Sequence, residues 1–493
     1  MNFKKALAFL LASTVALSLL LVSCGNSSAD TSEDTKPEQT DSDVTTEVDI
    51  LAGLNFGGRD FRIQMSNTAI SSADLMMDAG EATGDVVADA VYQRNLDVAD
   101  RLNVKFVYTE TDYNWDQVAT NVRKIIQAGD DAFELIVNDQ RGLGLLSAEK
   151  MFVNIYDCKY FDFDKVGWWY DYMRDLTIGN DRMYLLVGDY FIDVLCKAHV
   201  MYYNRDIFRD IYGDPDELYK AVNDGKWTFD LLITYIKDAY LDINGNSIID
   251  AEDRFGMIIA GVGGSIFPYE YAGEPDFISR DENGIPSITI ANDRSDLLYQ
   301  KIYDVYYNDA TYTNYQENSQ EFLNKFKSNG SLFISTVRIG DFGLLRDMES
   351  DIGILPYPKL DEAQSKYHTT VHDTAEIGVI PTTCGDPDFA SAVIQALCEE
   401  SNKTLIPAYY EIALKIKYTR DNYSSYMIDL IYDGIDANFP LVYGGSYAND
   451  IFTWSFLEPL QQKSQTWISS YEKRITAAEA QLQEFIDLYL SAE

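Results

Sequence analysis

The fold class is decided by a stretch that opens with Asp60-Phe-Arg-Ile-Gln-Met65 and closes with Phe133-Glu-Leu-Ile-Val137. Both segments, and Val104-Lys-Phe-Val-Tyr-Thr109 between them, have the short apolar or alternating pattern that is typical of β-strands. Helical patterns at residues 86–102 and 116–128 separate the three strands and place apolar side chains on one face of each helix. This β-α-β-α-β succession predicts an α/β fold with a parallel sheet.

A polar run follows the third predicted strand. Asp139, Gln140 and Arg141 come almost directly after residue 137. In open parallel sheets, ligands bind at the loops beyond the carboxyl ends of the strands, so these three residues are candidates for ligand binding. An ordinary polar loop is an equally good interpretation of the same residues.

Predicted strands and helices continue along the rest of the chain with different spacing. Asn204 and Thr228 each stand where a helix is expected to begin, because their side chains can cap its first turn. The further predicted elements are strands at residues 182–187, 198–203, 331–336 and 352–356, and helices from Asn204, from Thr228, near Pro387 and after Phe452.

The N-terminus has the anatomy of an export signal. Lys4 and Lys5 precede an uncharged apolar stretch at residues 6–22, and Cys24 follows at once. Leu21-Val-Ser-Cys24 resembles the bacterial lipobox, which predicts a signal peptide over residues 1–23 and lipidation of Cys24. The alternatives are an ordinary membrane helix and a cleaved signal peptide with an accidental Cys, but the stretch is at the short limit for crossing a bilayer. We expect an extracytoplasmic protein held at the cell membrane by its lipid.

Composition separates a tether from a globular body. Residues 24–54 begin with a run rich in Ser, Thr, Asp and Glu, which cannot bury enough apolar surface to order itself. Roughly 440 residues follow, enough for two or three domain-sized units. Loss of residues 1–23 lowers the formal net charge from −40 to −42, because it removes Lys4 and Lys5. This charge argues against nucleic acid as a partner and against direct adhesion to an anionic membrane.

Cysteine and histidine are too sparse to define a framework or a catalytic site. Four cysteines remain after Cys24, at positions 158, 196, 384 and 398, which is not the pattern of a disulfide scaffold. Cys398 falls on the apolar face of a predicted helix, where a buried free thiol is expected. The chain contains three histidines, which is too few to favour a His-based catalytic triad or a zinc site.

Five segments in the same order resemble motifs of one protein family. They are Tyr202-Tyr-Asn-Arg-Asp206, Gly225-Lys-Trp-Thr-Phe-Asp230, residues 326–334, Gly353-Ile-Leu-Pro-Tyr-Pro-Lys359 and Ile380-Pro381. The order and spacing are similar to those of bacterial extracellular solute-binding lipoproteins, in the group that serves ATP-driven importers of maltose and multiple sugars. The likeness extends over nearly all of the chain after the tether.

This resemblance implies a two-lobe α/β fold of the periplasmic-binding-protein type II, with discontinuous lobes joined by a hinge. We expect lobe 1 at residues 55–150 plus about 351–410, and lobe 2 at about 151–350 plus 411–493. The implied function is capture of a carbohydrate, with an oligosaccharide favoured, by a monomer that delivers it to the transmembrane subunits of an importer.

Further ligand-binding candidates follow from the resemblance and from sugar chemistry, because sugar rings pack on aromatic faces and their hydroxyls need polar partners. Trp168 and Trp169 lie in a polar, glycine-containing stretch, and we expect at least one of them to face the cleft. Tyr269 follows a glycine-rich loop, and Trp454 matches by position a cleft aromatic residue of the family. Arg338 is a candidate clamp for a hydroxyl or carboxylate, although an exposed salt bridge is the commoner role.

Residues 242–253 follow the pattern of an EF-hand calcium loop. The predicted ligands are Asp242, Asn244, Asn246, Asp250 and Asp253 by their side chains and Ile248 by its carbonyl. Ser247 stands where Gly usually permits a sharp turn, and Asp253 replaces the usual Glu, so a connecting turn that binds nothing is the alternative. The pattern favours a structural Ca²⁺.

Two other functions remain open at this stage. A receptor for a peptide or another polar solute would share the two-lobe fold. A secreted glycoside hydrolase needs two carboxylates, and 79 acidic residues offer many pairs. The family resemblance carries no catalysis, and we therefore do not expect an enzyme.

Overall fold

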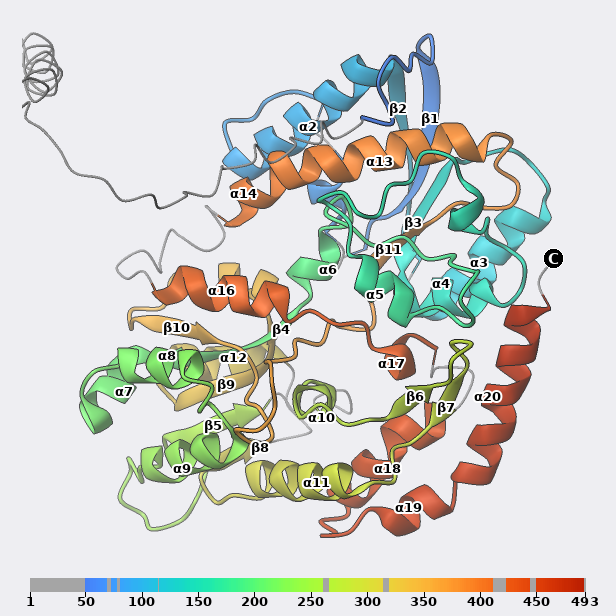
Figure 1. Cartoon of the computed structure of the whole chain (residues 1–493). Coiled ribbons are helices and arrows are strands. Elements are labelled where there is room, and N and C mark those ends of the chain that lie inside the picture. The colour runs from blue at the N-terminus through green and yellow to red at the C-terminus, as the bar shows by residue number, and fades with distance from the viewer. Residues whose placement is uncertain are drawn as a thin grey trace, which may run out of the picture. The chain divides into compact units, whose positions relative to one another are not determined.

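The stretch that decides the fold class forms three parallel strands and two helices, as its pattern predicts (Figure 1). β1 (Arg59–Ser66) lies between β2 (Val104–Thr111) and β3 (Leu135–Asp139), and both neighbours run parallel to it. α2 (Val86–Leu102) and α3 (Trp115–Gln127) connect the strands. All five elements lie within two residues of their predicted positions.

The computed structural model describes most of the chain after the predicted tether. The described residues are 49–68, 72–77, 80–113, 115–259, 266–313, 319–410, 423–443 and 449–491. The predicted signal peptide, Cys24 and the tether up to residue 48 lie outside these ranges. So does the glycine-rich loop that precedes Tyr269.

The first sheet is completed by a strand from much later in the chain. β11 (Glu376–Val379) pairs antiparallel to β3, which gives the order β11-β3-β1-β2. α13 (Pro387–Lys403) packs beside α2, and α4 (Gln140–Ser147) packs beside α3. Every residue of β3 is buried, as expected for a parallel strand with helices on both faces of its sheet.

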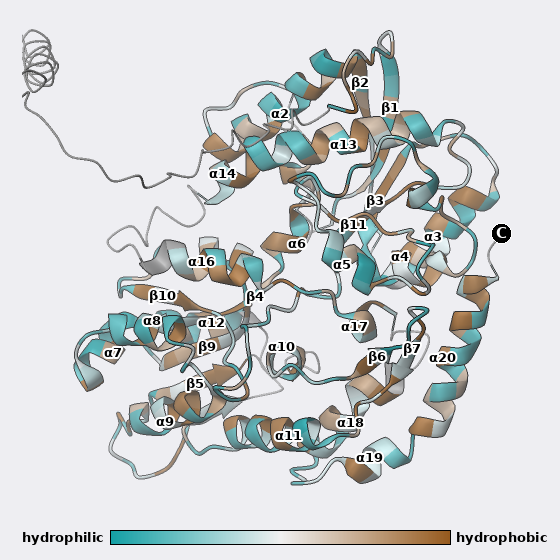
Figure 2. Cartoon of the chain, viewed as in Figure 1, coloured by the Kyte–Doolittle hydropathy of each residue, from teal (hydrophilic) through white to brown (hydrophobic). Residues whose placement is uncertain are grey.

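In the part of the chain that the structure describes, the second sheet has five strands in the order β10-β4-β9-β5-β8. β4 (His199–Asn204) pairs antiparallel to both β9 (Ser331–Arg338) and β10 (Ile352–Leu355). β5 (Phe255–Ile259) pairs parallel to β9 and to β8 (Thr311–Thr313). Several strands of both sheets are coloured as hydrophobic in Figure 2, whereas helices such as α2, α8 and α11 alternate between apolar and polar residues.

The remaining elements are mostly helices. They are the helices α5 (Tyr170–Asp175), α6 (Asp193–Cys196), α7 (Arg205–Tyr212), α8 (Asp216–Asn223), α9 (Phe229–Ala239), α10 (Phe267–Ala272), α11 (Asp293–Tyr306), α12 (Ser319–Lys327), α14 (Leu405–Tyr409), α16 (Tyr423–Asp433), α17 (Phe439–Tyr443), α18 (Asn449–Gln461), α19 (Ile468–Glu472) and α20 (Ile475–Leu490), the hairpin of β6 (Ile278–Arg280) and β7 (Pro286–Ile288), and 3₁₀ turns at Ala73–Leu75, Ile155–Asp157 and Ile339–Leu345.

Both predicted helix caps are confirmed. The Asn204 side chain accepts hydrogen bonds from the backbone amides of Asp206 and Ile207 at the start of α7. The Thr228 side chain accepts one from the backbone amide of Leu231 at the start of α9. Each cap satisfies an amide that has no partner within its own helix.

Two segments that connect the sheets run side by side. Residues 197–199 join α6 to β4, and residues 370–375 lead into β11. Their backbones exchange hydrogen bonds, from the His199 amide to the Thr370 carbonyl (2.9 Å) and from the His372 amide to the Lys197 carbonyl (3.0 Å). We call residues 197–199 and 370–375 the crossing segments, because each leads from one sheet to the other.

The predicted strand at residues 182–187 is wrong. The segment is apolar throughout after Arg182, but within it only Leu186 forms a bridge, to Gly378 of β11. Its apolar character therefore reflects burial and not a strand.

Several predicted boundaries also differ from the structure. Phe152 and Leu186 bridge to Pro381 and Gly378, so residues 152–186 lie with the first sheet and not with the second. β10 pairs with β4 in the second sheet, so the chain returns to the first sheet at β11 and not near residue 351. The tether ends before residue 54, because Leu51 is 2% exposed. Strand partners are non-local, and a linear pattern does not specify them.

The cysteines that follow the tether are buried and free. They are Cys158, Cys196, Cys384 and Cys398. The buried position of Cys398 on α13 is confirmed, and burial raises the pKa of its thiol. Within the described ranges, no helix combines the length and the apolar character needed to cross a bilayer.

Candidate functional site

The three polar residues that follow β3 are brought together with the crossing segments. Asp139 accepts a hydrogen bond from the Gly142 amide (2.8 Å) and so caps α4. The Gln140 side chain donates to the His372 carbonyl (2.9 Å), and Arg141 pairs with Asp373 (3.3 Å). Asp139 and Gln140 are only 6% and 1% exposed. The Gln140 and Arg141 side chains therefore hold α4 against a crossing segment.

The Asp139 carboxyl has an unusual environment. Burial raises its pKa to about 7, and the charge of Asp373 acts in the same direction. The Gly142 amide and the positive charges of Lys197 and Arg141 oppose this rise only in part. Asp139 therefore keeps its proton well above the pH at which an exposed carboxyl loses it.

We expect Asp139→Asn to remove part of the pH dependence of stability. The unfolded carboxyl ionises near its ordinary pKa of 3.8, whereas the folded one holds its proton up to about 7. Because the folded state binds more protons in this window, wild-type stability falls as the pH rises through it. The variant keeps an oxygen to cap α4, so its urea midpoint should match wild type near pH 4 and exceed it at pH 8. If the urea midpoints of the variant and wild type differ by the same amount at pH 4 and pH 8, the raised pKa of Asp139 is contradicted.

The two adjacent tryptophans have different surroundings. Trp168 is buried, donates to the Gln395 side chain on α13 (2.9 Å) and packs edge-on against Phe163. Trp169 is half-buried, donates to Asp189 (2.9 Å) and meets the Tyr432 ring of α16 at 5.3 Å. Since α16 packs on β10, Trp169 lies between elements that belong to different sheets. Of the pair, Trp169 is the more exposed, since Trp168 is only 9% exposed.

The other three predicted ligand residues lie apart from one another. Tyr269 is fully buried in the core of the second sheet and donates to Ser335 (2.7 Å), so its side chain presents no exposed surface to a ligand. Arg338 pairs with Asp341 (3.1 Å), the commoner of its two expected roles. Trp454 is 37% exposed on α18.

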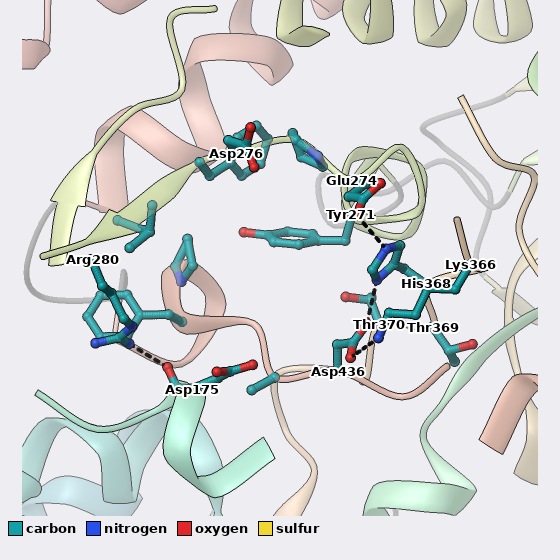
Figure 3. A pocket seen from close by; sticks show the side chains of 16 residues that line it. Asp175, Tyr271, Glu274, Asp276, Arg280, Lys366, His368, Thr369, Thr370 and Asp436 are labelled. Atoms are coloured by element: carbon teal, nitrogen blue, oxygen red, sulfur yellow. Dashed lines mark hydrogen bonds and ion pairs between the residues drawn. The ribbon is translucent and has the colours of Figure 1, made fainter. Parts of the chain in front are cut away.

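A pocket of about 470 Å³ lies beside one crossing segment (Figure 3). Its wall contains three aromatic side chains, Tyr271, Phe277 and Phe439. Tyr271 projects into the space between the labelled polar residues in Figure 3. Asp175 of α5 enters from the side of the first sheet, because α5 follows the stretch that packs against α13. The pocket is therefore bounded by segments associated with both sheets.

One side of the pocket is lined by charged side chains that pair with one another. Asp436 accepts hydrogen bonds from Lys366 (2.8 Å) and from the His368 ring. His368 also faces the Glu274 carboxylate at 3.6 Å. Burial alone would raise the pKa of Asp436, but the bonds from His368 and Lys366 hold it below its usual value. This carboxylate is ionised and already has its partners.

The opposite side offers acceptors without partners. Arg280 donates to the backbone carbonyls of Thr177 (2.7 Å) and Asp175 (2.6 Å), so its guanidinium is engaged in joining α5 to β6. The carboxylates of Asp175 and Asp276 form no hydrogen bond or ion pair within the described residues. They are the groups in this pocket that are available to a ligand with hydroxyl or amine donors.

None of the eight predicted ligand residues lines this pocket. The nearest prediction was Tyr269, two residues before Tyr271 on α10. Residues two apart on a helix point in opposite directions, so Tyr269 lies on the buried face of α10 and Tyr271 lines the pocket. The sequence contains one signal for this pocket, a run that mixes aromatic and acidic side chains. It is Tyr271-Ala-Gly-Glu-Pro-Asp-Phe277.

Comparison with known proteins gives matches in structure alone. No family model and no curated protein sequence matches the chain. A solute-binding protein of an ABC transporter from Thermotoga lettingae, bound with α-D-tagatose, is 11% identical with a TM-score of 0.53, covering 87% of this chain and 100% of that one.

Two further structures agree with it. A cyclo/maltodextrin-binding protein complexed with maltotetraose is 10% identical with a TM-score of 0.54, over 88% of this chain and 97% of that one. UgpB from Mycobacterium tuberculosis, in complex with glycerophosphocholine, is 12% identical with a TM-score of 0.56, over 87% and 99%. The chain therefore has the α/β fold of such solute-binding proteins, the periplasmic-binding-protein-like fold of type II, and the predicted fold class is confirmed.

Proposed function

We propose that this protein is a receptor that captures a carbohydrate, with an oligosaccharide favoured, outside the cell for an ATP-driven importer. The pocket beside the crossing segment is the observation that carries the proposal. It combines aromatic faces with two carboxylates that lack partners, which is the lining that sugar rings and hydroxyls require. Structural relatives complexed with tagatose and with maltotetraose support the same ligand class.

In this proposal, the two sheets are the cores of two lobes and the crossing segments are the hinge between them. Bending at residues 197–199 and 370–375 would bring α5 toward the elements around Tyr271. A ligand that contacts both sides stabilises the closed state by the difference between its affinities for the closed and open forms. Asp175 on one side and Tyr271 on the other are the contacts that we assign to this closure.

The lipid anchor and the importer as partner are proposed from the sequence alone. Export by residues 1–23 and a lipid on Cys24 would hold the monomer at the outer surface of the cell membrane, at the end of a tether. Its partners there would be the transmembrane subunits of the importer. The strongly acidic body is consistent with a protein that stays dispersed outside the cell.

A second candidate ligand is a polar solute other than a sugar. UgpB of Mycobacterium tuberculosis has a similar fold and is complexed with glycerophosphocholine. In the pocket described above, the carboxylates of Asp175 and Asp276 beside aromatic rings would also suit a ligand with a cationic group. A peptide ligand remains the third possibility, and a glycoside hydrolase is the enzymatic one.

The proposal is tested by thermal unfolding of residues 49–493 with a panel of oligosaccharides and with peptides and glycerophosphocholine as counter-sets. A ligand at a hundred times its dissociation constant adds about 2.7 kcal/mol, which gives a visible rise in Tm. We expect one glycan class to stabilise the protein and to be recovered intact. Stabilisation by a counter-set alone would overturn the carbohydrate assignment, and a cleaved glycan would favour the hydrolase.

Substitutions in the pocket then test whether the ligand binds there. Tyr271→Ala and Asp175→Asn should each weaken binding by about tenfold or more, equivalent to about 1.4 kcal/mol. Tyr156→Ala is the matched control, since Tyr156 is 38% exposed and does not line the pocket. Full affinity in both pocket variants would move the binding site elsewhere on the molecule.

A further inference from the structure

The loop between α9 and β5, which carries the EF-hand pattern, shows two backbone features that the pattern requires. Asp242, at the first position of the pattern, accepts hydrogen bonds from the amides of Gly245 (2.7 Å) and Ser247 (2.9 Å). Ser247 has φ +60°, in the left-handed region for which EF-hand loops usually employ Gly. The serine at this position therefore does not prevent the turn that the motif needs.

The side chains at the ligand positions gather around Asp250. The Asn246 amide nitrogen donates to the Asp250 carboxylate (2.7 Å), and the Asn244 amide nitrogen lies 3.4 Å from the same oxygen. The side chains at positions three, five and nine of the pattern therefore lie together, as the ligands of one ion do. An Asn side chain carries an oxygen as well as a nitrogen, so rotation of its amide presents a metal ligand in the same place.

Asp253, at the twelfth position, supplies an independent observation. It is 1% exposed, and its Oδ2 accepts hydrogen bonds from the Tyr240 hydroxyl (2.7 Å) and from the Asp250 amide (3.1 Å). The second bond turns the carboxylate toward the loop. Its Oδ1 is buried and has no hydrogen-bond partner among the residues that the structure describes. A buried carboxylate oxygen without a partner is costly, and a cation in the loop would satisfy it.

We propose that residues 242–253 bind one Ca²⁺. Its ligands are the side-chain oxygens of Asp242, Asn244, Asn246, Asp250 and Asp253 and the carbonyl of Ile248. Hard oxygen donors in a flexible set of this size suit Ca²⁺ better than the smaller Mg²⁺, which demands near-octahedral geometry. No three His, Cys, Asp or Glu side chains of the described residues already form a metal-binding group, so the Asn oxygens and the carbonyl are essential members of the set.

The ion would stabilise the second sheet and would not take part in the ligand pocket. Tyr240 ends α9, Asp253 lies two residues before β5, and Leu241 bridges to Arg254 across the loop. A bound cation would fix both ends of the loop and so hold α9 against β5. This role is independent of the proposed transport function.

Terbium luminescence tests the site, because Tb³⁺ occupies calcium loops and the ring of Tyr240 lies beside Asp253. We expect excitation of tyrosine to give Tb³⁺ emission that Ca²⁺ displaces, and Ca²⁺ to raise Tm with a Kd of about 10⁻⁴ to 10⁻³ M, as in extracellular sites. Asp253→Asn and the exposed Asn246→Ala should each abolish the displaceable emission and the rise in Tm.

Glu252→Gln is the matched control. It removes an acidic residue of the same loop at position eleven, which supplies no ligand in the pattern. We expect this variant to keep both signals. Emission that persists unchanged in Asp253→Asn and Asn246→Ala would show binding to other carboxylates of this acidic chain and would overturn the proposal. Equal stabilisation by Mg²⁺ and Ca²⁺ would overturn the assignment of the ion.

Discussion

Replacement of Lys197 by methionine is expected to destabilise the protein by about 3–5 kcal/mol. Lys197 lies in a crossing segment, is 4% exposed and pairs with Asp193 at 2.9 Å. Its ammonium also donates to the Thr374 carbonyl of the other crossing segment (2.6 Å). Burial and the neighbouring charge of Asp193 raise the pKa of Glu376 well above its ordinary value, and Lys197 opposes this rise. Without Lys197, the buried carboxyl groups of Asp193 and Glu376 lose the cation that pairs with the first and opposes the pKa rise of the second.

Urea unfolding at neutral pH measures this effect, with Lys220→Met as the control. Lys220 pairs with Glu217 at 2.6 Å, but both side chains are about half-exposed. Exposed pairs contribute about 0–1 kcal/mol, so the control should unfold close to wild type. An equal and small effect in the two variants would show that the crossing segments do not depend on the buried pair.

The second large effect is expected for Trp227→Ala, at about 3–5 kcal/mol. Trp227 is fully buried, and its ring nitrogen donates to the Pro356 carbonyl (2.9 Å). Its ring packs on Phe333 of β9 at 5.9 Å. Truncation leaves a cavity and also an unpaired carbonyl, so both the lost packing and the lost hydrogen bond contribute.

Trp454→Ala is the matched substitution, since this tryptophan is 37% exposed. We expect less than about 1 kcal/mol of destabilisation there, as for other exposed positions. The comparison is made from the midpoints of chemical unfolding. A Trp227 variant as stable as the Trp454 variant would contradict the assigned packing of the second sheet.

These contacts explain why the family motifs were informative about the fold. The motif at residues 225–230 supplies Trp227, which bonds to Pro356 of the motif at residues 353–359. Tyr203 of a third motif packs on Phe333 of a fourth. Segments that are far apart in the chain thus form one core, and side chains in such a core tolerate little change of shape.

The first sheet was predictable because its elements are local. α2 begins and ends where its apolar period predicts, and the parallel direction of β1 to β3 follows from the helices between them. The caps at Asn204 and Thr228 were predictable for the same reason, since a capping side chain bonds within three residues of itself.

The ligand pocket was not predictable in the same way. Tyr271, His368 and Asp436 come from three distant segments that meet only after the sheets have formed. The choice between Tyr269 and Tyr271 depends on which face of α10 packs on the second sheet, and no local rule sets this for a six-residue helix. The positions of Trp168 and Trp169 likewise depend on α13 and α16, which follow them by more than two hundred residues.

The α/β class, the two helix caps, the parallel direction of β1 to β3, the segments that resemble solute-binding proteins and the spacing of the loop at residues 242–253 could all be predicted from the sequence. Each of these depends on residues that are close in the chain or on a repeated pattern. Only the tertiary structure decided which sheet β10 joins, which aromatic side chains keep exposed surface, and which carboxylates lack partners. Those properties arise when distant segments pack together and exclude water, and burial of that kind is not encoded at any single position.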